Sequence, residues 1–75
     1  MAMSEATVAY RVNTGSGMKH GTAIFRFEHE ADAGAIEKDN AARLKGRDIA
    51  SAATGFSRIR IFIDKVEIKH VKPFQ

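Results

Sequence analysis

The sequence predicts an α+β domain in which a small antiparallel sheet carries one helix on one face, in the order strand, strand, helix, strand. Three observations indicate this class. They are two alternating segments around a glycine-rich break, an alanine-rich segment at helical period, and an isoleucine-rich alternating stretch near the end. The 75 residues have room for a single domain, 1–75. Within it we expect residues 1–5 and 73–75 to be flexible tails.

The first half of the chain predicts an antiparallel hairpin. Residues 6–12 alternate, and their apolar face is made by Val8, Tyr10 and Val12. Residues 20–29 alternate again, and their apolar face is made by Ala23, Phe25 and Phe27. Period two over these lengths is typical of half-buried strands. Two glycines within three residues, at 15 and 17, predict the turn between them.

The alanine-rich segment from Ala31 to Lys45 predicts a helix. Its apolar stripe is expected to consist of Ala33, Ile36, Ala41 and Leu44. Asp32 is a candidate N-cap or first-turn acid, and Gly46 is a natural stop before a second short helical turn. The alternative is one continuous helix that tolerates Gly46 and ends at Gly55, at a cost of about 1 kcal/mol relative to Ala.

Residues 57–71 predict a long last strand with a defect. Its apolar side chains first occupy odd positions and then, after Asp64-Lys65, even ones. A bulge or bend there would absorb the slip; the alternative is a tight hairpin, which we disfavour because Asp-Lys is not a pair that readily takes positive φ. We expect the two halves to face opposite ways, one towards the helix and the other towards a second subunit. They are Ile59/Ile61/Ile63 and Val66/Ile68.

Composition excludes several classes of protein. No Cys is present, so the chain has no disulfide and no cysteine-based zinc or iron–sulfur site. No apolar run approaches the about 20 residues of a membrane span, and the N-terminus does not resemble a signal peptide, so we expect a cytoplasmic protein. Of 33 apolar residues 12 are Ala, which predicts a thin core and favours a homodimer.

The sequence shows no constellation that points to catalysis. Its serines lack the context of an activated nucleophile, and Gly15-Ser16-Gly17 lacks the helix that a phosphate-binding loop requires. The three histidines, His20, His29 and His70, do not share a helical spacing that would hold a metal. We therefore expect no enzyme, cofactor or metal; a small enzyme with a site shared between subunits is the residual alternative.

Charge is the most informative feature. The net charge of +3 divides into +2 for residues 1–27, −4 for 28–42 and +5 for 43–75. The acidic patch comprises Glu28, Glu30, Asp32, Glu37 and Asp39. The candidate binding residues are Arg43, Lys45, Arg47, Arg58, Arg60, Lys19 and Tyr10. Arg58 and Arg60 are expected to share one strand face, and Tyr10 could stack on a base.

This dipolar arrangement favours an oriented contact with a protein partner, and the chain is interpreted as a non-enzymatic adaptor or stoichiometric inhibitor. Direct nucleic-acid binding through the basic residues is the alternative. In its short length, lack of cysteine and lack of catalytic motifs, the chain is similar to accessory proteins of phages and other mobile elements, such as anti-CRISPR inhibitors. That likeness implies inhibition by occupying a surface of a host complex.

Overall fold

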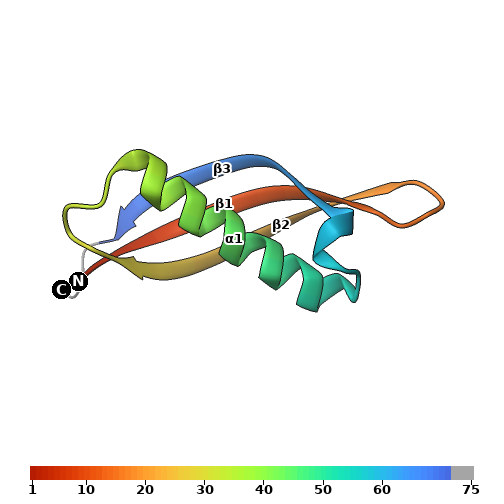
Figure 1. Ribbon diagram of the computed structural model, residues 1–75, viewed down its shortest axis with the longest axis horizontal. Coiled ribbons are helices and arrows are strands. Elements are labelled where there is room, and N and C mark those ends of the chain that lie inside the picture. Colours follow the sequence, from red (N-terminus) through yellow and green to blue (C-terminus); the bar gives the residue numbers. More distant parts are fainter. Residues whose placement is uncertain (72–75) are drawn as a thin grey trace.

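The computed structural model describes residues 1–71 and has one helix lying across one face of a three-stranded sheet (Figure 1). The elements in chain order are β1 (Ala2–Asn13), β2 (Met18–His29), α1 (Ala35–Thr54), the 3₁₀ turn η1 (Arg58–Arg60) and β3 (Ile61–Val71). The predicted class and the order β-β-α-β are confirmed. The tail expected at 73–75 lies outside the described residues. In the described part, no helix is long and apolar enough to cross a membrane.

The first strand, β1, is the centre of the sheet and pairs antiparallel with both neighbours, in the order β2-β1-β3. Its apolar face is the predicted one. The expected tail at 1–5 is wrong for residues 2–5, because β1 begins at Ala2 and Ser4 is paired on both sides and buried. The predicted glycine turn closes the hairpin, and Gly15 has the left-handed φ of 90° that glycine adopts without strain.

Helix α1 is continuous, so the predicted end at Gly46 is wrong and the alternative of one long helix is confirmed. Its N-cap is Gly34 and not Asp32. Gly55 ends it in the left-handed conformation, with φ of 78°, and its backbone N–H donates to the carbonyl of Ser51. Gly46 is tolerated inside the helix because it packs closely against Val8 of β1.

The face of α1 that meets the sheet is made of small residues, namely Ala42, Gly46 and Ala50. A Cβ placed on Gly46 would lie 3.0 Å from both methyl groups of Val8 on the central strand. The predicted stripe is therefore wrong: Ile36 is 79% exposed and Leu44 is 65% exposed. The larger helix side chain that packs against the core is Ile49, and it is only partly buried.

The predicted bulge in the last strand is confirmed, and the hairpin alternative is wrong. Ala9 pairs with Lys65 and Tyr10 with Ile63, so Asp64 is the extra residue. Because the bulge absorbs the slip, Ile63, Val66 and Ile68 pack against the same buried cluster beneath α1. The expectation that the two halves face opposite ways is thus wrong, and the homodimer stays a prediction without that support.

The core is thin, as its composition predicts, and consists of two adjoining clusters. One is centred on Tyr10, Val12, Ala23, Ala50 and Ile61, and the other on Ala6, Val8, Phe27 and Ala42. Phe25 and Ile63 are partly buried and pack against both clusters, so they join them into one layer. The small residues of α1, together with Ala6 on β1, allow the helix to lie close to the central strand.

The contact between Gly46 and Val8 predicts a stability effect whose sign depends on background. Gly46→Ala gains about 1 kcal/mol of helix propensity, but overpacking against Val8 costs about 1–3 kcal/mol, so we expect net destabilisation. In a Val8→Ala background the same substitution has room and should stabilise. Urea unfolding of the four chains of this double-mutant cycle measures both effects. A stabilising Gly46→Ala in the otherwise unchanged protein would contradict the close packing.

Candidate functional site

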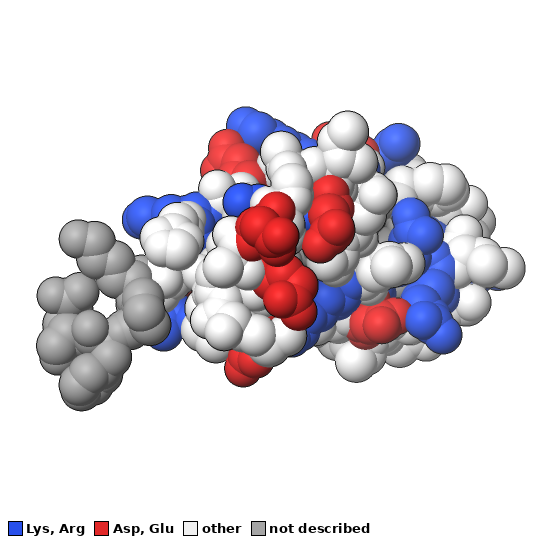
Figure 2. All heavy atoms as spheres, turned by 60° about the vertical axis from the view of Figure 1, so that its left-hand side comes forward, with Lys and Arg blue, Asp and Glu red and all other residues white. Residues whose placement is uncertain are grey.

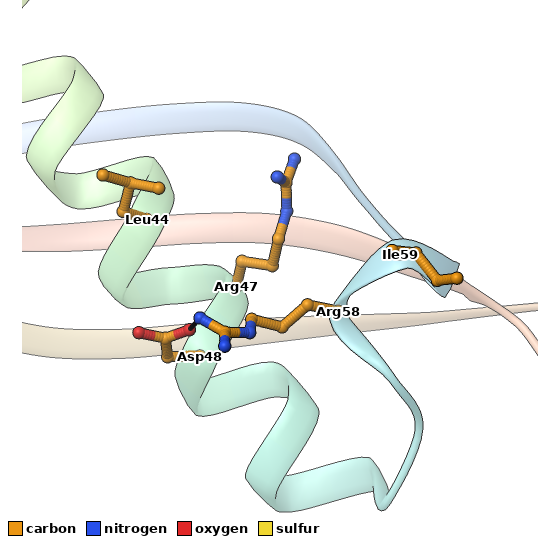
Figure 3. A pocket seen from close by; sticks show the side chains of 5 residues that line it. All are labelled: Leu44, Arg47, Asp48, Arg58 and Ile59. Atoms are coloured by element: carbon orange, nitrogen blue, oxygen red, sulfur yellow. Dashed lines mark hydrogen bonds and ion pairs between the residues drawn. The ribbon is translucent and has the colours of Figure 1, made fainter.

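The structure brings together two of the predicted binding residues, Arg47 and Arg58, in one hollow of about 260 Å³. The hollow lies between α1 and η1, as the close view in Figure 3 shows. We call it the α1–η1 hollow and define it by its five lining residues, Leu44, Arg47, Asp48, Arg58 and Ile59.

Local structure explains why these five residues meet. On α1, positions 44, 47 and 48 are spaced by three and four residues and so lie on one side of the helix. The chain then turns back after Gly55, where the Ser51 hydroxyl donates to the carbonyl of Phe56 at 2.7 Å. The tight turn η1 follows and sets its side chains beside the helix.

An ion pair spans the α1–η1 hollow. The Arg58 Nη1 group donates to Asp48 Oδ1 at 2.7 Å, and both side chains remain more than half exposed. Pairs of this exposure contribute about 0–1 kcal/mol to stability. The expectation that Arg58 and Arg60 share a strand face is wrong, because both lie in η1 ahead of β3.

Arg47 is not part of that pair. Its side chain runs from α1 away from the Asp48–Arg58 contact (Figure 3). Its Nε atom is buried and has no hydrogen-bond partner among residues 1–71. A buried donor without an acceptor costs about 1–3 kcal/mol. The Arg47 Nε is such an unsatisfied donor.

The apolar part of the α1–η1 hollow consists of two exposed aliphatic side chains. Leu44 is excluded from the core by the close packing of α1, and Ile59 is 86% exposed because η1 interrupts the strand pattern. A single exposed aliphatic residue is ordinary, but here two of them line the same depression together with two arginines. Sequence reasoning missed both, since it placed them on buried faces. The small residues at 42, 46 and 50 were the available signal for the true face of the helix.

The other predicted basic residues do not form one patch. Arg43 Nε donates to Asp39 at 2.7 Å on the helix itself. The Lys45 ammonium lies 5.8 Å from the centre of the Phe25 ring. Arg60 donates to the carbonyl of Asn13 at 3.3 Å, near the hairpin turn. Figure 2 accordingly shows basic side chains at several separate places on one view of the molecule.

Tyr10 is not available for base stacking, contrary to expectation. It is only 9% exposed and belongs to the core. Its ring covers Gly21 on β2, where an added Cβ would lie 2.5 Å from the phenol. The alternation that identified the face of β1 correctly thus placed this tyrosine inside the protein.

The predicted acidic patch is divided. Glu37 and Asp39 lie in the first turns of α1, and Glu30 and Asp32 lie in the segment just before it. Figure 2 shows acidic side chains gathered on the view that brings this end of the molecule forward. Glu28 follows the buried Phe27 on β2 and therefore faces the opposite side of the sheet. The structure does not bring it to the others.

The sheet face opposite α1 is polar and carries its own ion pairs. Arg11 Nε donates to Asp64 at 2.7 Å, and the Arg26 and Glu5 side chains lie 3.7 Å apart. Lys65 and Glu67 form a further pair at 3.0 Å. Large apolar side chains are also exposed on this face, namely Ile24 at 66% and Phe62, which lies beside Arg11, at 42%. The pairs make this face a solvated surface with little net charge.

A second hollow of about 570 Å³ lies beside the hairpin turn and includes the predicted residue Lys19. The remaining lining residues are Thr14, Ser16, Gly17, Met18 and Phe56. Its hydroxyls are engaged within the turn, where Thr14 Oγ1 donates to the carbonyl of Gly17 at 3.1 Å and lies 3.3 Å from the Ser16 hydroxyl. Lys19 is the one charged group in this lining, so the hollow has few groups that could orient a ligand.

The ring of His29, the last residue of β2, is hydrogen-bonded to protein groups on both nitrogens. His29 Nδ1 lies 2.8 Å from the carbonyl of Glu30, which can only accept, so this nitrogen carries the proton. Its Nε2 lies 2.7 Å from the hydroxyl of the buried Ser4, which donates to it. With both ring nitrogens bonded, His29 joins the end of β2 to the start of β1 as a structural residue.

The Asp48–Arg58 pair should contribute little to the free energy of unfolding. We expect Asp48→Asn and Arg58→Gln each to change the free energy of unfolding by less than about 0.5 kcal/mol, because exposed ion pairs are weak. Chemical denaturation of the two variants and of the double variant measures the single effects and their coupling. A coupling above about 1 kcal/mol would show that the pair holds η1 in place.

Comparisons with known proteins were made by sequence and by structure. A scan against protein-family models and searches of curated proteins and of solved structures found no match. The chemistry of the α1–η1 hollow is therefore the basis for a functional conclusion.

Proposed function

We propose that this protein is a small non-enzymatic binding module that occupies the surface of a protein partner, as an adaptor or a stoichiometric inhibitor. The observation that carries the proposal is the α1–η1 hollow, in which the exposed Leu44 and Ile59 stand among charged side chains. Protein interfaces characteristically combine such an apolar centre with a polar rim. Arginine is also enriched among the few interface residues that supply most of the binding energy.

The nucleic-acid alternative has less support. Two of the predicted phosphate-binding residues, Arg43 and Arg58, are already paired with aspartates at 2.7 Å. The candidate stacking residue Tyr10 is buried. Binding to a phosphate backbone depends on several cations that act together, whereas the predicted basic residues lie at separate places and are engaged by different neighbours.

The proposed function predicts that the protein captures a partner through the α1–η1 hollow. The tagged protein should retain one protein at equal stoichiometry from a lysate of its host at near-physiological salt. Leu44→Ser with Ile59→Ser should abolish retention, because the variant loses the apolar centre while the core is untouched. Ile24→Ser, on the opposite sheet face, is the matched control and should retain the partner. Quantitative mass spectrometry of the eluates measures the outcome. No stoichiometric protein, or equal capture by all three chains, would refute the proposal.

A further prediction distinguishes binding to a protein from binding to nucleic acid. Fluorescence anisotropy with labelled single-stranded DNA, duplex DNA and RNA at low salt should show no saturable binding. An affinity that falls steeply with salt and is lost in Arg58→Ala together with Arg60→Ala would instead establish nucleic-acid binding. The affinities of the unsubstituted protein and of a Lys65→Ala variant, changed on the opposite sheet face, serve as controls.

A further inference from the structure

We infer that the α1–η1 hollow receives a carboxylate that stands beside an aliphatic side chain on the protein partner, with Arg47 as the residue that anchors it. This inference rests on the proposed function and specifies the chemistry of the partner. It is argued from the charge, the geometry and the size of the hollow.

The charge of the hollow is unbalanced in favour of an anion. Its lining contains two arginines and one aspartate. Asp48 is engaged by Arg58 at 2.7 Å, and Arg47 has no acidic group within ion-pair distance in the described part of the chain. A carboxylate would balance the remaining charge, whereas a cationic side chain would meet Arg47 unfavourably.

The geometry of Arg47 suits such an anchor. The side chain is half-buried and starts from the middle of α1, beside the hollow. In Figure 3 its guanidinium points away from the Asp48–Arg58 pair and is not drawn into it. Nε itself is buried and has no acceptor among residues 1–71, so a carboxylate of the partner would meet the terminal Nη groups. A planar guanidinium binds a carboxylate through two parallel hydrogen bonds, which also fixes its orientation.

The size and the apolar walls of the hollow define the rest of the ligand. Leu44 and Ile59 lie on either side of Arg47 in Figure 3 and offer contact for an aliphatic group. The volume of about 260 Å³ lies below the roughly 300–1,000 Å³ of pockets that enclose a free small molecule. One acidic and one aliphatic side chain that project from a larger partner fit this size better.

Selection of displayed random peptides against the full chain tests the inference. The selected peptides should be enriched in Asp or Glu within a few residues of Leu, Ile, Val or Met.

A synthetic peptide of the most enriched sequence should bind Arg47→Gln at least about tenfold more weakly, because charge-assisted hydrogen bonds are lost. Arg47→Lys should bind with intermediate affinity, since it keeps the charge but not the paired donors. Arg26→Gln on the far sheet face is the matched control and should bind normally. Thermal unfolding by circular dichroism verifies that each variant is folded.

Several outcomes would overturn the inference. They are selection of peptides without acidic residues, no enrichment over an uncoated surface, or an affinity of Arg47→Gln within twofold of the unchanged protein. Failure here is distinguishable from failure of the proposed function. A partner that is captured by Arg47→Gln but lost by Leu44→Ser with Ile59→Ser would overturn the carboxylate assignment and leave protein binding intact. Absence of any captured partner would refute the proposed function itself.

Discussion

The close approach of α1 to the central strand is the constraint on which the rest of the structure depends. Gly46 packs so closely on Val8 that an added Cβ would lie 3.0 Å from its methyl groups, and alanines above and below it continue the small-residue face. A core built this way needs few large side chains, which agrees with an apolar inventory dominated by alanine. Leu44 does not lie on this small-residue face and becomes part of the surface, whereas Ile49 packs partly buried against the core.

The bulge at Asp64 complements this packing. It keeps Ile61 and Ile63 before the bulge and Val66 and Ile68 after it on the helix face, so that one helix covers both halves, whereas Phe62 lies on the opposite face beside Arg11. The extra residue accepts a hydrogen bond from Arg11 on the opposite face, where the Asp64 side chain is 34% exposed. That face carries paired charges of both signs and is suited to contact with water.

The proposed binding function follows from the residues that the core does not use. The link between α1 and β3 is held by local hydrogen bonds, and it presents Arg58 and Ile59 beside the side of the helix that faces solvent. Several basic residues are engaged by neighbours, whereas the Arg47 Nε is a buried donor that has no acceptor in the described part of the chain. The surface therefore combines exposed apolar area with one unsatisfied charge, which favours an oriented contact with a protein over general attraction to phosphate.

The sequence by itself determined the class, the element order, the inward faces of the hairpin and the bulge, because alternation and its interruption are local properties of the chain. It also contained both arginines of the hollow among its candidates. Only the tertiary structure decided which side of α1 is buried, since a glycine that is costly in an isolated helix becomes favourable where it allows close packing. Tyr10 lies on the inward face that alternation predicts, and there its ring covers Gly21. The meeting of Arg47, Arg58, Leu44 and Ile59 depends on a turn that brings two separate segments together, which no local pattern encodes.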